Sequence, residues 1–139
     1  MRRWSVFVML GALVLSSTGC ASSSAATSPT GTLSTETFTG AVDVGSQAAH
    51  PFTVAASGSS EATVDLTTAG PPSTIFMGVG VGSYSNSVCT LLTNGYAIVQ
   101  ARATAQLSGT LTGGSYCVMV YDAGNQTAQV SYTVVVTHY

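Results

Sequence analysis

Apolar and polar residues alternate along much of this chain, and this two-residue period is the feature that most limits its fold. Segment 62–67 (ATVDLT) and segment 130–137 (VSYTVVVT) place most apolar side chains on one side of an extended backbone and polar ones on the other. β-branched and aromatic residues are frequent in both segments, as strands favour. No stretch after residue 19 has the 3.6-residue period of an amphipathic helix. The sequence therefore predicts an all-β chain.

Turn-forming residues divide these alternating runs into short strands. The pair Asn94-Gly95 is the sharpest signal, because a type I′ hairpin turn needs positive φ at both central residues. The spacing of the turns predicts a single antiparallel β-sandwich of Greek-key or jelly-roll type, with eight or nine short strands. The expected strands are 37–42, 49–55, 61–67, 73–81, 88–93, 96–101, 104–111, 115–122 and 128–138.

The first residues of the chain have the pattern of an export signal. Two arginines precede an almost continuous apolar run at 4–15, which is too short to cross about 30 Å of hydrocarbon as a helix. The run ends in LSSTGC, which resembles the lipobox of bacterial lipoproteins, with Gly19 and Cys20 in the family's positions. We expect residues 1–19 to be a lipoprotein signal peptide. An ordinary secretory signal with an incidental cysteine is the alternative.

The resemblance to bacterial lipoproteins implies that the thiol of Cys20 receives a diacylglycerol. Acyl chains such as palmitate would then anchor the mature chain to a membrane of the cell envelope. Ala21 rather than Asp follows the cysteine, which in that family implies the outer membrane in cells that have one. Residues 20–36 are rich in Ser, Thr and Ala and have few large apolar groups, so we expect a disordered tether there. The β-sandwich domain is expected at 37–139.

Cationic side chains are almost absent after the signal peptide. The mature chain has no Lys and a single Arg, Arg102, against five acidic residues. Nucleic-acid binding requires clustered cations against phosphates, so the composition excludes that class of partner. It also excludes P-loop and Schiff-base chemistry, which need a lysine. No cofactor is expected.

Two cysteines remain once Cys20 is assigned to the lipid anchor. Export would carry Cys89 and Cys117 to an oxidising compartment, where such a pair is expected to form a disulfide. If Tyr116 and Val118 face the core, Cys117 faces outward. The bridge would then join neighbouring strands, or a strand and a covering loop. A metal site or a reactive thiol is the alternative, although no Cys/His cluster has zinc spacing.

The segment 111–120 (LTGGSYCVMV) resembles the L-x-x-G-x-Y-x-V-x-V corner of Greek-key sandwiches. It is most similar to the bacterial pre-peptidase C-terminal domain, and the resemblance extends over 45–138. That family implies a jelly-roll-like sandwich in which the Tyr hydroxyl bonds nearby backbone and the two valines enter the core. Its Asp-rich strand is absent at 73–81, and no metal site is carried over. The corner residues are Leu111, Gly114 and Tyr116, followed by Val118 and Val120.

Glycines alternate with valines in the segment 78–82 (GVGVG). As a strand, this segment would have one face without side chains, which permits close approach of another backbone or a flat ligand. Either the loop at 83–88 covers this face, or the face is a shallow ligand groove. Tyr84, Tyr96 or Tyr121 could flank such a groove and stack on a sugar ring. The candidate groove residues are Gly78, Gly80, Gly82 and Tyr84.

No catalytic constellation is evident. The only histidines are His50 and His138, and no G-x-S-x-G motif is present. Asp122 and Asn125 indicate a strand-end turn, with calcium binding as the alternative. We therefore predict a non-catalytic envelope lipoprotein that binds or spaces other surface components. A carbohydrate-binding module is the alternative, which exposed tyrosines on one flat face would favour, and a hydrolase is more distant.

Overall fold

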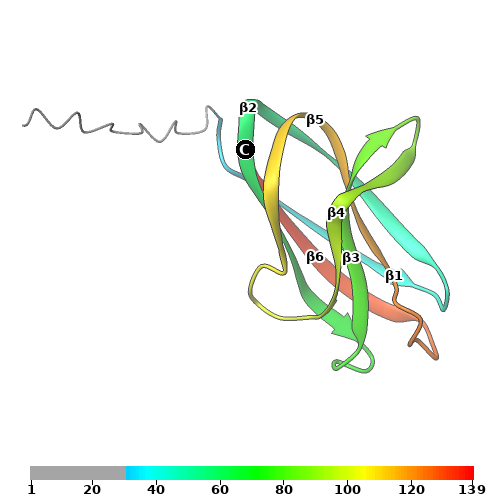
Figure 1. Cartoon of the computed structure of the whole chain (residues 1–139). Helices are drawn as coiled ribbons and strands as arrows, with labels where there is room; N and C mark the ends of the chain where they lie inside the picture. The colour runs from blue at the N-terminus through cyan, green and yellow to red at the C-terminus, as the bar shows by residue number, and fades with distance from the viewer. Residues whose placement is uncertain (1–30) are drawn as a thin grey trace, which may run out of the picture.

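The computed structural model describes residues 31–139, and this part of the chain is built of antiparallel strands without a helix (Figure 1). The predicted all-β class is confirmed. The expected signal peptide and Cys20 lie outside the described residues. The tether expected at 20–36 is wrong at 34–36, because these residues pair with 136–138 and begin the first strand. The strands are β1 (Ser34–Val42), β2 (Gln47–Gly70), β3 (Phe76–Ser85), β4 (Val88–Gln100), β5 (Leu107–Asp122) and β6 (Val130–His138).

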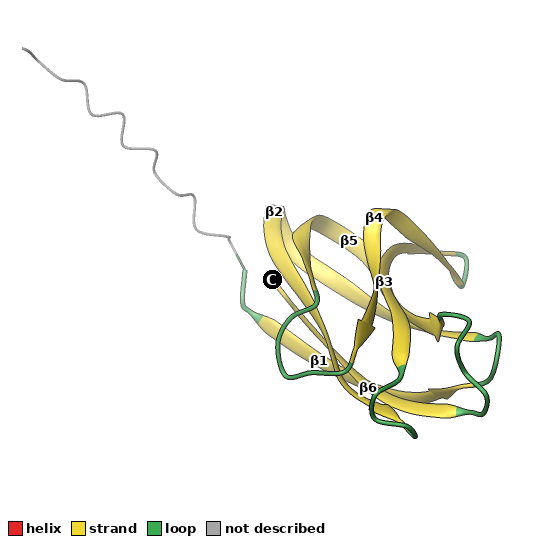
Figure 2. Ribbon diagram, turned by 60° about the horizontal axis from the view of Figure 1, so that its bottom comes forward, coloured by secondary structure: helices red, strands yellow, loops and turns green. Residues whose placement is uncertain are grey.

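All six of these strands belong to one sheet, in the order β1-β6-β2-β5-β3-β4. The first half of β2 pairs with the second half of β5, and the second half of β2 pairs with the first half of β5. Strand β6 adds to the second half of β2, whereas β3 adds to the second half of β5. The sheet therefore curls into two facing layers, as Figure 2 shows. This is the sandwich-like arrangement that the alternating sequence predicts.

The described chain has six long strands where eight or nine short ones are expected. The turn residues at 57–58 and 113–114 lie inside β2 and β5. Gly58 has a φ of 94° and lies where the register between the two strands shifts. Because β2 and β5 pair on both sides of this position, the turn residues bend the two strands and do not reverse the chain.

The hairpin predicted at Asn94-Gly95 is wrong. Both residues lie inside β4, and only Asn94 has a positive φ, 61°. The chain reverses instead between β3 and β4, at Asn86 and Ser87, whose φ values are 50° and 63°. Two consecutive positive φ angles are what a two-residue type I′ turn requires. The hairpin turn is therefore formed by Asn86 and Ser87, a pair that the sequence analysis did not identify.

The core lies between the two layers and confirms the inward faces predicted from the alternation. In β6 and in residues 60–66 of β2 every second residue is buried, and β5 contributes the two valines that the corner motif predicts. Burying such branched side chains contributes roughly 1.5–3 kcal/mol each relative to exposure. The most completely buried core residues of these strands are Val54, Val64, Leu66, Val118, Val120, Val130, Val134 and Val136.

Aromatic and imidazole rings pack together where β1 and β6 of one layer meet the first half of β2 in the other layer. The ring of His50 stacks on Phe38 with centroids 4.9 Å apart, and its Nε2 lies 2.7 Å from the hydroxyl oxygen of Tyr132. Burial lowers the pKa of His50 and so favours the neutral ring at this position. His138 of β6 packs against Phe52 in the first half of β2. Both histidines therefore take part in joining the layers.

The predicted disulfide between Cys89 of β4 and Cys117 of β5 is present, with a Cα–Cα distance of 5.8 Å. The bridge does not cross the core, as expected, but it joins strands that are not direct neighbours, because β3 lies between them. A Cβ on Gly82 of β3 would lie 3.0 Å from the Cys117 sulfur. The bridge thus passes over a glycine, and Cys117 is buried although it faces away from the core.

Replacing both bridge cysteines by alanine should lower the melting temperature by roughly 10–30 °C. The bridged residues are 28 apart in sequence, and closing a loop of this length stabilises by about 3–4 kcal/mol on the chain-entropy model. Thermal unfolding of the full-length chain, followed by circular dichroism, measures this. Wild-type protein in excess reductant should melt with the variant. A melting temperature unaffected by either treatment would contradict the structural role of the bridge.

Candidate binding surface

Large apolar and aromatic side chains are exposed together on the outer face of the layer formed by β4, β3 and β5. The exposed fraction is 47% for Phe76, 55% for Tyr96 and 60% for Ile98, and Tyr121 beside them is partly exposed. Monomeric proteins seldom expose such groups contiguously unless the surface has a binding role. We call this surface the aromatic face, and its members are Phe76, Tyr96, Ile98 and Tyr121.

The strand register places these side chains on one side of the sheet. Gly78 of β3 is paired with Ile98 of β4 and with Tyr121 of β5, and paired residues project to the same side. Tyr96 belongs to the next row, where it is paired with Gly80. Since β3 contributes glycine to both rows, the side chains of the flanking strands can meet across it.

The groove predicted over the glycines is filled by neighbouring side chains. A Cβ on Gly78 would lie 2.1 Å from the Tyr121 ring, and one on Gly80 would lie 2.6 Å from the Leu91 side chain. All three glycines of the stripe, Gly82 included, are buried. Gly78 therefore lets the Tyr121 ring lie across β3. The outer surface over the glycines is flat, whereas the sequence analysis expected a groove there.

The loop predicted to cover the glycines does not do so either. Residues 83–85 continue β3, and the chain reverses immediately afterwards. Tyr84, which was expected to flank the groove, is partly exposed and is paired with Cys89 near the end of the hairpin. Tyr96 and Tyr121 of the aromatic face were suggested from the sequence as stacking groups. Its other two members, Phe76 and Ile98, were not expected.

The aromatic face contains no Asp, Glu, Lys, Arg or His side chain. Burial raises the pKa of Tyr121, and the nearby phenol of Tyr96 raises it further. The Tyr121 hydroxyl therefore stays protonated, and a tyrosine hydroxyl can both donate and accept hydrogen bonds at the edge of an apolar surface. This combination suits a neutral ligand that has both apolar and hydroxyl-bearing sides.

Asp122 ends β5 and holds two turns together, as predicted for a strand-end turn. Its carboxylate accepts backbone N–H groups from Gly45 and Gly124, each at 2.8 Å, and the Gly45 bond makes the largest contribution in lowering the pKa of Asp122. Weaker bonds from Asn125 and Gln126 add to this. Within residues 31–139, no three His, Cys, Asp or Glu side chains are grouped as metal ligands.

The corner predicted from the 111–120 motif is only partly as expected. Leu111 is buried and the Tyr116 ring packs against Phe52, with centroids 6.0 Å apart. The Tyr116 hydroxyl, however, lies 3.4 Å from the hydroxyl of Thr112, and no bond to backbone is present. The expected backbone bond is wrong because this segment, Gly114 included, lies inside β5, whose backbone pairs with β2.

Sequence reasoning missed two members of the aromatic face, Phe76 and Ile98. The available signal was the segment 96–99 (YAIV), which is apolar on both sides of an edge strand. An edge strand needs only one apolar side for the core, so the second apolar side indicates a further contact.

A scan against models of protein families finds no match to this chain, and a search of curated proteins finds none that matches. Within residues 31–139, no helix has the length and apolar character that crossing a membrane would require.

Replacing Gly78 by alanine should lower the free energy of unfolding by about 1–3 kcal/mol, the usual cost of overpacking. The new methyl group would occupy the position of the Tyr121 ring and displace it. The matched control is Gly109→Ala, where a Cβ meets no atom within 4 Å. Urea unfolding of both variants gives the comparison. Equal stabilities would mean that the Tyr121 ring does not rest on Gly78.

Proposed function

We propose that this chain is a lipid-anchored protein of the bacterial cell envelope whose β-sandwich is a non-catalytic binding module for an uncharged glycan. The lipobox-like ending at Cys20 supports the anchor, and the disulfide suits an oxidising compartment outside the cytoplasm. The aromatic face is the surface that would carry the glycan.

The observation on which the proposal rests is the exposure of Tyr96 on a flush face beside Tyr121. A pyranose ring has a side of C–H groups that packs on an aromatic ring, while its hydroxyls point outward around the edge. Tyrosine offers a large rigid contact surface at low cost in conformational entropy, together with a hydroxyl for hydrogen bonding. A flat surface of this kind fits one side of an extended polysaccharide.

The charge of the chain favours a neutral glycan over an acidic one. Arg102 is the only cationic side chain of the mature sequence, and it follows the end of β4. A polymer rich in phosphate or carboxylate would find few partners for its charges. The glycan would therefore be recognised by stacking and hydrogen bonding.

A protein partner on the same face is the second candidate. Strand β4 is at the edge of the sheet, and its residues Tyr96 and Ile98 are among the most exposed large side chains of residues 31–139. A partner could cover these side chains and also pair with the free edge of β4.

Membrane anchoring is tested by Cys20→Ser in the full-length chain. The substitution removes the only thiol that the lipobox-like ending offers for acylation, so the protein should move from the membrane fraction to the soluble fraction. Metabolic labelling with radioactive palmitate should mark the wild type and not the variant. A wild-type chain that takes up no label would refute the lipid anchor.

Glycan binding is tested with the full-length chain in detergent on an array of neutral and acidic glycans. Tyr96→Ala should weaken binding about three- to tenfold, the range expected for one stacked aromatic contact. Val88→Ala is the matched control, since Val88 is equally exposed on β4 but lies outside the aromatic face.

Binding of a neutral glycan that Tyr96→Ala weakens and Val88→Ala leaves intact would support the module. Binding to no glycan, or equal losses in both variants, would refute it. Cross-linking at the cell surface would then examine the protein partner.

A further inference from the structure

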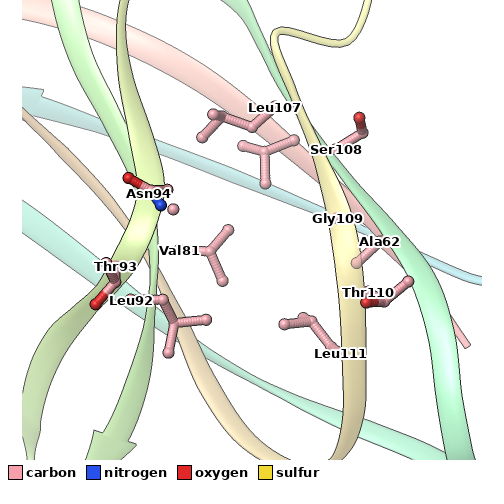
Figure 3. Close-up of a pocket in the computed structure, with 12 residues that line it drawn as sticks. Ala62, Val81, Leu92, Thr93, Asn94, Leu107, Ser108, Gly109, Thr110 and Leu111 are labelled. Carbon is pink, nitrogen blue, oxygen red and sulfur yellow. The ribbon is translucent and has the colours of Figure 1, made fainter.

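A pocket of about 190 Å³ opens between the two layers, apart from the aromatic face (Figure 3). Its walls are apolar side chains from both layers, and its mouth includes the segment 93–95 of β4. The pocket is partly open to solvent, and its volume is larger than a single water molecule needs. The main apolar wall residues are Ala62, Val81, Leu92, Leu107 and Leu111.

One wall of the pocket is created by two small residues that face each other. Ala62 of β2 is paired with Gly109 of β5, and the neighbouring inward row pairs Val64 with Leu107. A Cβ on Gly109 would meet no atom within 4 Å. The row formed by Ala62 and Gly109 therefore leaves a gap between larger neighbours.

The opposite wall is created by a bulge in β4. Val81 lies between Gly80, which is paired with Tyr96, and Gly82, which is paired with Leu91. Residues 92–95 thus face Val81 alone, and such an insertion bends the strand and turns its side chains. Leu92 packs against the core cluster, where it lines the pocket.

We propose that this pocket binds a small uncharged molecule with an apolar ring of about the size of benzene. A cavity of roughly 150 Å³ with apolar walls accommodates benzene, so the volume fits one ring. None of the lining residues is charged, which disfavours an ionic ligand. The bulge residues Thr93 and Asn94 are at the mouth, where a polar substituent of the ring would meet the solvent.

The proposal is independent of glycan binding, because the pocket lies on the inner side of the sheet and the aromatic face on the outer side. Parallel titrations of the full-length chain with phenol and with cyclohexanol test it by two-dimensional amide NMR. Both probes are neutral, water-soluble rings. We expect saturable shift changes in the amides of 92–95 and 107–111.

Two variants fill the pocket from opposite strands. Ala62→Leu and Gly109→Val should each weaken binding of the probes by about tenfold or more. Thr63→Leu is the matched control, because Thr63 is next to Ala62 on β2 but projects to the other side of the strand. If the Ala62 variant does not fold, the Gly109 variant still shows whether filling the pocket weakens binding of the probes.

Saturable shifts at the pocket, lost in the filled variants and kept in Thr63→Leu, would support the proposal. Shifts confined to the aromatic face, no saturable shifts, or unchanged binding by a folded filled variant would each overturn it.

Discussion

The pairing of β2 with β5 is the constraint on which the rest of the structure depends. Both strands bend, and they remain hydrogen-bonded on both sides of the bend, so the two layers share a continuous backbone ladder. Strands β1 and β6 extend one layer, and β3 and β4 extend the other. The core, the packing of rings around His50 and the orientation of the outer face all follow from this arrangement.

Residues with small side chains, or with none, determine the shape of both candidate binding regions. Gly78 lets the Tyr121 ring lie across β3, which makes the aromatic face flush. The row of Ala62 and Gly109 leaves a gap that becomes the pocket. In a chain with so few charges, shape and neutral polar groups provide the means of recognition, and small residues control the shape.

The features that were predicted correctly from the sequence are those set by short-range chemistry. The alternation in 62–67 and 130–137 identified the inward faces, and Asp122 was recognised as a strand-end turn residue. The turn at Asn94-Gly95 was predicted wrongly. A positive φ at Asn94 fits a hairpin or a bulge equally well, and the partner strand decides between them.

The sequence by itself predicted that residues 37–139 are all-β, which side chains of 62–67 and 130–137 face the core, and that Cys89 and Cys117 form a disulfide. These properties follow from the two-residue period and from the chemistry of exported cysteines. Only the tertiary structure decided the strand order, the grouping of Phe76 and Ile98 with the tyrosines, and the pocket. The physical reason is that strand partners and register depend on contacts between residues far apart in the chain, which no local pattern encodes.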